Sequence, residues 1–218
     1  MSGRVGSITT DIIADGLVFN MDAANRACYP GSGTTATDTI GNNVGTLSNT
    51  PLLSNLNFGV WELGGVDDQI LLSSSLIFST TFSLSIWINP TILNSNQNIL
   101  GNGSSSQNWI NPSSATNLRV KPAGTLLNFP ETGGNNLSAN VWNYIVIYRD
   151  SSNDIGIFVN GFPFSSPQNN SNTLTLATIG RGVNKWFSGK LGPFQAYNRA
   201  LSSNEVLHNY NALKGRFE

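Results

Sequence analysis

The sequence has 218 residues, of which 11% are charged, and its formal net charge at pH 7 is -1. So few charges make no broad field for a phosphate backbone or an anionic lipid surface, and we therefore expect neither nucleic-acid binding nor membrane insertion. Hydrophobic residues make up 39% of the chain and aromatic residues 10%, enough for a packed core. The length suits one all-β domain.

The single cysteine, Cys28, excludes an internal disulfide framework and a cysteine-built zinc site, and we expect it to be a buried thiol. The first residues contain no apolar signal-peptide core, and no stretch approaches the roughly 20 apolar residues of a membrane span. We therefore expect neither classical secretion nor membrane anchoring.

The first dozen residues carry no strong pattern and precede the first clear strand. They predict an N-terminal arm, residues 1–13, outside a domain that spans residues 14–218. The pattern leaves open whether this segment docks on a partner or is a frayed terminus.

Strand-like runs bounded by turn residues then recur along the chain, with the spacing of an antiparallel sandwich. They are Gly16–Met21, Gly59–Leu63, Gln69–Leu72, Phe82–Asn89, Asn98–Gly101, Leu118–Val120, Trp142–Tyr148 and Ile155–Val159. Two intervening segments rich in Gly, Ser, Thr and Asn, 29–51 and 102–117, are predicted as long loops.

Two local patterns are sharper. In Phe82–Asn89 the apolar residues alternate with Ser83, Ser85, Trp87 and Asn89, which predicts one core face and one half-solvated face. Asn160 and Gly161 separate two apolar runs and predict a hairpin, because a type I′ turn needs positive φ at both central positions.

One helix is predicted near the end of the chain. Ser202 and Glu205 form a capping box, Leu201 and Val206 occupy the hydrophobic-staple positions, and Gly215 follows as a stop.

The run Phe187-Ser-Gly-Lys-Leu-Gly-Pro-Phe, followed by Tyr197-Asn-Arg-Ala-Leu-Ser and this helix, resembles the closing segment of laminin-G-like, concanavalin A-like domains. Leu63-Gly-Gly-Val-Asp-Asp-Gln-Ile and the strand at Phe82 resemble further segments of that family in the right order. The resemblance implies an all-β fold, a two-sheet antiparallel jelly-roll sandwich with one short C-terminal helix.

A narrower resemblance links Asp15-Gly-Leu-Val-Phe-Asn-Met-Asp and Tyr197-Asn-Arg-Ala-Leu to lectin-like structural proteins of tailed phages. It implies a non-enzymatic virion component, an outer capsid decoration or a fibre-associated protein, made in the host cytoplasm. Its partners would be other virion proteins and host-surface glycans, with self-association left open. The alternative is a soluble carbohydrate-binding module or lectin.

A glycoside hydrolase of this fold would carry the pattern Glu-x-Asp-x-x-Glu, which is absent. Glu62 and Glu131 are isolated in the sequence, Glu205 is explained by the capping box, and Asp67 and Asp68 favour a turn over catalysis. The sequence therefore predicts that the protein is not an enzyme.

Calcium is the cofactor that the resemblance implies, because related loops supply the oxygen ligands calcium prefers. The matching residues here are Asp38, Asn42 and Asn43, in a loop shorter than the family pattern. A calcium-free structural turn is the alternative.

Sugar binding needs an exposed aromatic face beside hydrogen-bonding groups. Trp109, and Trp186 together with Arg181, lie in such a setting and are the predicted carbohydrate-binding residues. The alternative is that the two tryptophans anchor loops or fill an interface. Trp61, Trp87 and Trp142 lie in predicted strands and are expected to pack in the interior.

Overall fold

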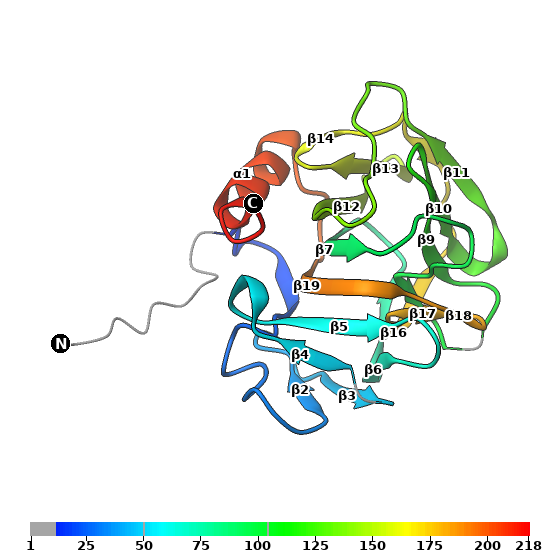
Figure 1. Ribbon diagram of the computed structural model, residues 1–218. Helices are drawn as coiled ribbons and strands as arrows, with labels where there is room; N and C mark the ends of the chain where they lie inside the picture. The colour runs from blue at the N-terminus through cyan, green and yellow to red at the C-terminus, as the bar shows by residue number, and fades with distance from the viewer. Residues whose placement is uncertain (1–11, 50, 104) are drawn as a thin grey trace.

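The computed structural model describes residues 12–49, 51–103 and 105–218. Two antiparallel sheets pack face to face, and a single α-helix of the described chain, α1 (Ser203–Lys214), lies against the outside of one of them (Figure 1). The predicted two-sheet sandwich with a short C-terminal helix is confirmed. Of the predicted arm, only Ile12 and Ile13 fall within the described residues, and both pack beside the helix-covered cluster.

The sheet that carries the helix, here called sheet A, has nine described strands and β19 near its centre. Its main path is β14 (Phe162–Pro163), β13 (Asp154–Val159), β12 (Asn143–Arg149), β7 (Phe82–Pro90), β19 (Ser188–Tyr197), β5 (Val60–Gly64) and β4 (Leu52–Ser54). Off this path, β1 (Leu17–Met21) pairs with β19 and β15 (Gln168–Asn169) pairs with β13.

The opposing sheet, sheet B, has eight described strands. Their order is β11 (Leu127–Pro130), β10 (Asn117–Lys121), β9 (Trp109–Ser114), β8 (Leu100–Gly101), β16 (Leu174–Ile179), β6 (Gln69–Phe78), β3 (Val44–Ser48) and β2 (Thr35–Thr37). A separate hairpin joins β17 (Arg181–Gly182) to β18 (Lys185–Trp186). The two short 3₁₀ turns are η1 (Leu56–Phe58) and η2 (Pro122–Gly124).

The two segments predicted as long loops contain strands. Residues 29–51 include β2 and β3, and residues 102–117 include all of β9. Their Gly, Ser and Asn residues carry little strand signal, and the pairing of β3 with β6 and of β9 with β10 supplies the order that local propensity does not. The prediction of loops is therefore wrong over these strands.

The main core fills the space between the sheets. On β7 it takes Phe82, Leu84, Ile86 and Ile88, the face predicted from the alternation. Cys28 is buried beside this core as expected, and burial raises the pKa of its thiol to about 11. The hairpin at Asn160 and Gly161 is also confirmed, with φ of 50° and 87° at the two central positions.

The other face of β7 differs from the prediction. Ser83 and Ser85 are 0% exposed and Trp87 is 2% exposed, so the expected half-solvated face is buried there. The chain after the last strand covers it: the Trp87 ring stacks on Tyr210 at 5.7 Å and on Phe217 at 4.4 Å between centroids. An amphipathic helix with an apolar side needs such a surface, and it makes a second core on the outside of sheet A.

The helix begins as the capping box predicts. The Ser202 side chain accepts from the backbone N–H of Glu205, and the Glu205 carboxylate accepts from the N–H of Ser202. The Arg199 guanidinium donates to the same carboxylate and, together with these bonds, lowers the pKa of Glu205 to about 2. Gly215 ends the helix in a right-handed conformation, so it stops the helix without the left-handed cap that glycine often supplies.

A buried ion pair fixes the segment beyond the helix. Arg216 Nη1 and Nη2 donate to Asp22 Oδ2 and Oδ1 at 2.6 and 2.9 Å, a two-pronged contact across the outer face of sheet A. The same guanidinium donates to the carbonyl oxygens of Asn57 and Gly59, so all its donating nitrogens are satisfied by the protein.

Among the described residues, no helix has the length and apolar character that a membrane-spanning helix requires.

We predict that Asp22→Asn lowers the free energy of unfolding by about 3 kcal/mol, because it leaves Arg216 charged and unneutralised in a buried site. Urea-induced unfolding measures the change. Asp15→Asn is the matched control, since Asp15 also pairs with an arginine but its side chain is 84% exposed, and its loss should cost below about 1 kcal/mol. Equal losses in the two variants would contradict this role of the buried pair.

We predict that Glu205→Gln makes the stability of the protein less dependent on pH between about pH 4.5 and pH 2. Because the pKa of Glu205 falls from its ordinary 4.5 to about 2 on folding, its carboxylate stabilises the fold above pH 4.5 and stops doing so as the pH falls towards 2. Thermal unfolding of the two proteins across this range should therefore show a gap that closes at low pH. A gap that stayed constant would assign the effect to lost packing, and Glu62→Gln on an exposed strand position serves as the control.

Candidate functional site

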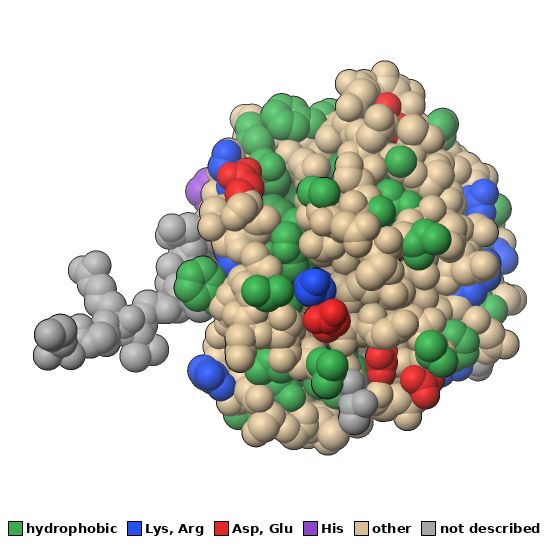
Figure 2. Space-filling model, in the orientation of Figure 1, with side chains coloured by type: hydrophobic (Ala, Val, Ile, Leu, Met, Phe, Trp, Pro, Cys, Tyr) green, Lys and Arg blue, Asp and Glu red, His purple; other side chains and the backbone are tan. Residues whose placement is uncertain are grey.

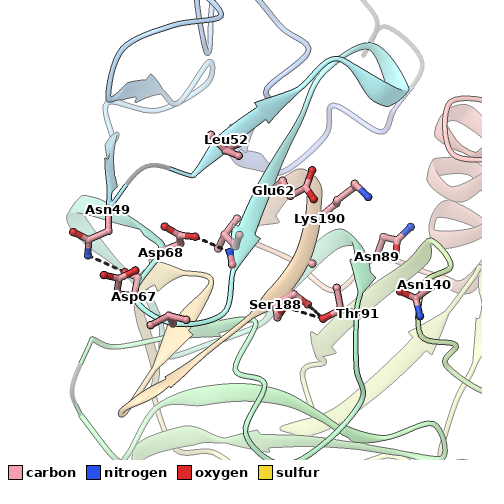
Figure 3. A pocket seen from close by; sticks show the side chains of 14 residues that line it. Asn49, Leu52, Glu62, Asp67, Asp68, Asn89, Thr91, Asn140, Ser188 and Lys190 are labelled. Atoms are coloured by element: carbon pink, nitrogen blue, oxygen red, sulfur yellow. Dashed lines mark hydrogen bonds between the residues drawn. The ribbon is translucent and has the colours of Figure 1, made fainter.

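A groove of about 540 Å³ lies on the outer face of sheet A, beside the part covered by the C-terminal segment. It runs over the strands β5, β19 and β7 and ends at the loop between β5 and β6 (Figure 3). Its lining residues are Asn49, Leu52, Glu62, Leu63, Gly64, Val66, Asp67, Asp68, Asn89, Thr91, Asn140, Ser188, Gly189 and Lys190.

Strand register places one row of side chains across this groove. Leu52 on β4 pairs with Glu62 on β5, Glu62 pairs with Lys190 on β19, and Lys190 pairs with Asn89 on β7. The neighbours of Glu62 along the strand, Trp61 and Leu63, belong to the main core, so alternation turns Glu62 outward. The sheet therefore carries a carboxylate, an ammonium and an amide side by side on its open surface.

The floor of the groove is fixed by short contacts. Thr91 Oγ1 donates to Ser188 Oγ at 2.8 Å, and the Thr91 backbone N–H donates to the Ser188 carbonyl oxygen at 2.9 Å (Figure 3). Gly189 lies so close to the neighbouring strand that a Cβ there would come within 2.2 Å of the Asn89 carbonyl oxygen, and its φ is 141°. Only glycine fits there, and it lets the backbones of β19 and β7 approach each other closely.

The acidic end of the groove is a turn built on an aspartate. Asp68 Oδ2 accepts from the Gly64 N–H at 2.6 Å, and the Asp67 carbonyl oxygen accepts from Asn49 Nδ2 at 3.0 Å (Figure 3). Asp68 thus acts in the turn as the sequence suggests, and these contacts hold Val66 and Asp67 at the edge of the groove.

The groups above this floor have no internal partner. Within the described chain, no hydrogen bond or ion pair engages the side chains of Glu62, Asp67, Asn89, Asn140 or Lys190. They offer carboxylate acceptors, an ammonium donor and amides that donate and accept. The groove combines a rigid base with polar groups that are open to a ligand.

The three predicted carbohydrate-binding residues lie elsewhere, but the structure brings them together. Arg181 and Trp186 pair in the hairpin of β17 and β18, and a Cβ on Gly182 would lie 3.0 Å from the Cβ of Trp109 on β9. Lys121 Nζ lies 5.7 Å from the Trp109 ring and the Arg181 guanidinium 5.1 Å from the Trp186 ring.

Each cation lies over one face of its tryptophan ring, and the rings of Trp109 and Trp186 are only partly exposed. Trp109 Nε1 also donates to the Ser106 carbonyl oxygen at 3.2 Å, which anchors its loop. The surface around Trp109, Arg181 and Trp186, here called the tryptophan surface, therefore combines an anchored loop with two partly exposed rings. A role in sugar binding stays a prediction for these three residues.

The predicted calcium ligands also come together, in a shallow cleft of about 210 Å³ lined by Asp38, Asn42 and Asn43. Asp38 Oδ1 already accepts from the N–H groups of Asn20 and Ile40, and Asn43 Oδ1 accepts from Ser73 and Ser74.

Calcium takes six to eight oxygen ligands, whereas this loop has one carboxylate, and one oxygen of Asp38 and the side-chain oxygen of Asn43 already accept hydrogen bonds from the protein. The described residues hold no cluster of three acidic, histidine or cysteine side chains. As folded here, the residues do not fit a calcium site, and the implied calcium stays a prediction of the resemblance.

Sequence reasoning missed the groove. It treated Glu62 as isolated, whereas register sets it opposite Lys190 and the β5–β6 turn brings Asp67 and Asp68 to the same opening. The available signal was a polar residue between core residues on a strand, as in Trp61-Glu-Leu and Gly189-Lys-Leu. That pattern identifies outward residues but not which strands are neighbours.

A family model described as the concanavalin A-like lectin/glucanases superfamily matches residues 63–207, more than half of the chain. The chain belongs to this family. The matched region includes β5 from Leu63, the turn with Asp67 and Asp68, and the strands that carry Asn89 and Lys190. A comparison with curated protein sequences finds no match.

Similar solved structures agree on the fold. Domain 4 of AbnA, an extracellular arabinanase from Geobacillus stearothermophilus in complex with arabinotriose, is 15% identical with a TM-score of 0.67 over 89% of this chain and 98% of that one. The ligand-binding domain of botulinum neurotoxin serotype D, in complex with N-acetylneuraminic acid, is 16% identical with a TM-score of 0.67 over 94% of this chain and 52% of that one. The chain thus spans about half the length of this toxin domain.

A third similar structure is Trypanosoma rangeli sialidase in complex with the inhibitor DANA. It is 13% identical, with a TM-score of 0.62 over 91% of this chain and 33% of that one. At such identities the likeness extends to the fold and not to individual binding residues.

Proposed function

We propose that this chain is a non-enzymatic carbohydrate-binding domain that holds a saccharide in the groove over β5, β19 and β7. The observation that carries the proposal is the set of unengaged polar side chains above a fixed floor, with Glu62, Asn89 and Lys190 side by side on three strands. The volume of about 540 Å³ falls in the range of small-molecule sites.

The chemistry of the groove suits a polyhydroxylated ligand. Each sugar hydroxyl donates one hydrogen bond and accepts others, so it pairs with a carboxylate such as Glu62, an ammonium such as Lys190 and an amide such as Asn140. The exposed side chains of Leu52 and Val66 flank these groups and offer apolar contact to the C–H faces of a sugar ring.

The similar structures support a saccharide as the ligand class, because two of them hold arabinotriose and N-acetylneuraminic acid. They support the class only, since their identities to this chain are 15% and 16%.

A binding role is favoured over hydrolysis by what surrounds Glu62. Its cross-strand partners are Leu52 and Lys190, so no second carboxylate faces it from a neighbouring strand. The other acids of the groove come from one turn, where Asp68 is engaged by the Gly64 N–H. A glycosidase needs two carboxyl groups flanking one glycosidic bond, one of them able to donate a proton.

We predict that Asn89→Ala combined with Lys190→Ala lowers oligosaccharide affinity at least roughly tenfold, since each removes a hydrogen-bonding group worth about 1 kcal/mol or more. Calorimetry with arabinotriose, cello-oligosaccharides and chito-oligosaccharides measures binding, and an assay for new reducing ends should stay negative. Hydrolysis that Glu62→Gln abolishes would contradict the non-enzymatic role.

The matched control is the pair Trp109→Ala and Trp186→Ala on the tryptophan surface. If binding is lost in these variants and kept in the groove variant, the saccharide site is the one predicted from the sequence and the groove is not the site.

We further propose that the domain acts as part of a phage virion, as a capsid decoration or a fibre-associated component. The support is the resemblance of the segments at Asp15 and Tyr197 to lectin-like phage proteins, and in the structure these two segments are neighbours. Leu17 on β1 pairs with Tyr197 on β19, and Arg199 pairs with Asp15 at 2.8 Å. A soluble carbohydrate-binding module or lectin is the alternative.

Co-sedimentation with particles that lack the protein tests this role, and we expect saturable binding at a stoichiometry set by capsid symmetry. A chain lacking residues 1–10 should lose occupancy if the predicted arm attaches it. Light scattering reports whether the free protein self-associates, and a monomer that ignores the particle would favour the soluble lectin.

A further inference from the structure

The turn η1 before β5 has an unusual backbone. Asn57 and Phe58 have φ of 51° and 63°, and Gly59 follows with φ of 127°. Glycine adopts such values without cost and asparagine tolerates them, but for a bulky residue such as phenylalanine the left-handed region is strained. Phe58 therefore occupies a conformation that most residues of its kind avoid.

Burial of the Phe58 side chain does not offset this strain. Phe58 is 72% exposed, the second most exposed of the large hydrophobic residues described, and Leu56 in the same turn is also exposed. Burial of an aromatic ring is a common reason to tolerate local strain, and it does not apply here. Residues held in strained backbone conformations cluster at active sites and ligand-contact sites.

The rest of the structure imposes this conformation. Arg216 donates through Nε to the Asn57 carbonyl oxygen at 2.6 Å and through Nη2 to the Gly59 carbonyl oxygen at 2.7 Å, which holds the backbone on both sides of Phe58. The Asn57 side chain is also fixed, because its Oδ1 accepts from Trp142 Nε1 at 3.2 Å and its Nδ2 donates to the Arg216 carbonyl oxygen at 2.6 Å.

The turn lies next to the groove along two chain segments. Phe58 precedes Glu62 by four residues, a separation of at most about 14 Å. On the other side, Trp142 bonds Asn57 and follows Asn140, which lines the groove, by two residues. The distance from Glu62 to Phe58 suits a ligand longer than one sugar ring.

We propose that Phe58 is an aromatic subsite that extends the groove, on which one ring of an oligosaccharide packs its C–H face. The inference rests on the proposed carbohydrate-binding function and deepens it, since it makes the ligand an oligosaccharide. The groove binds one part of the oligosaccharide through hydrogen bonds at Glu62, Asn89 and Lys190, and Phe58 holds the next sugar ring by apolar contact. The bonds from Arg216 fix the backbone that carries the ring before the ligand arrives, which lowers the entropy lost on binding.

The variant Phe58→Asn distinguishes the contribution of the ring to binding from that of the backbone conformation, because asparagine tolerates the left-handed backbone but lacks the ring. The probes are the trimer and the hexamer of whichever neutral saccharide binds the wild-type protein in the calorimetric panel. We expect Phe58→Asn to weaken hexamer binding roughly three- to tenfold, to change trimer binding less, and to leave the melting temperature equal or higher. Phe58→Tyr should keep wild-type affinity, and Leu56→Ala is the matched control for an exposed apolar residue of the same turn.

Hexamer binding that is unchanged in Phe58→Asn would overturn the subsite and leave the groove intact. Loss of trimer and hexamer affinity by the same factor would also overturn it, because the ring would then act through the fold of the groove. If no saccharide of the calorimetric panel binds the wild-type protein, the proposed function fails, and the subsite with it. A melting temperature that rises while hexamer affinity falls would support strain kept for binding.

Discussion

Arg216 brings the end of the chain back to β1, where its guanidinium meets the Asp22 carboxylate in a site closed to solvent. A buried charge pair is not by itself a source of stability, because desolvation offsets much of the attraction. Its value here is positional: one planar group is satisfied by Asp22 and by two carbonyl oxygens of the turn before β5. It thereby joins the first strand, the turn at Phe58 and the C-terminal segment, which local propensity would not bring together.

The covered half of sheet A follows from this anchoring. Phe217 comes directly after Arg216 and stacks on Trp87, and Tyr210 of the helix stacks on the same indole. The covering segment ends beside Trp142, whose ring packs against Phe217. Beyond it the surface of β5, β19 and β7 stays open, and this open part is the groove (Figure 3). On the face shown in Figure 2 uncharged polar groups predominate and charged side chains are few, as expected from a chain with 11% charged residues.

Local chemistry made part of this fold predictable. The capping box at Ser202 and the turn at Asn160 depend on neighbours a few residues away, so their patterns were sufficient. The burial of Ser83 and Ser85 was missed because the segment that covers this face comes more than 100 residues later, as at Leu201, whose N–H donates to Ser83 Oγ. Alternation shows two faces without showing what covers them. The groove was missed for the same reason, since the meeting of Glu62 and Lys190 is a matter of register between distant strands.

The net charge of -1 conceals two surfaces of opposite sign. The groove carries three carboxylates and one ammonium, whereas cations at Lys121, Arg181 and Lys185 surround Trp109 and Trp186. At physiological ionic strength charges further apart than about 8 Å are largely screened, so each surface acts on the ligand that occupies it. If these surfaces bind saccharides as proposed, one with a carboxylate would be repelled from the groove and attracted to the tryptophan surface, whereas a neutral one would be held in the groove by hydrogen bonds and apolar contact. The acidic sugar bound by the similar toxin domain is therefore a poor guide to the groove, and a neutral oligosaccharide suits it better.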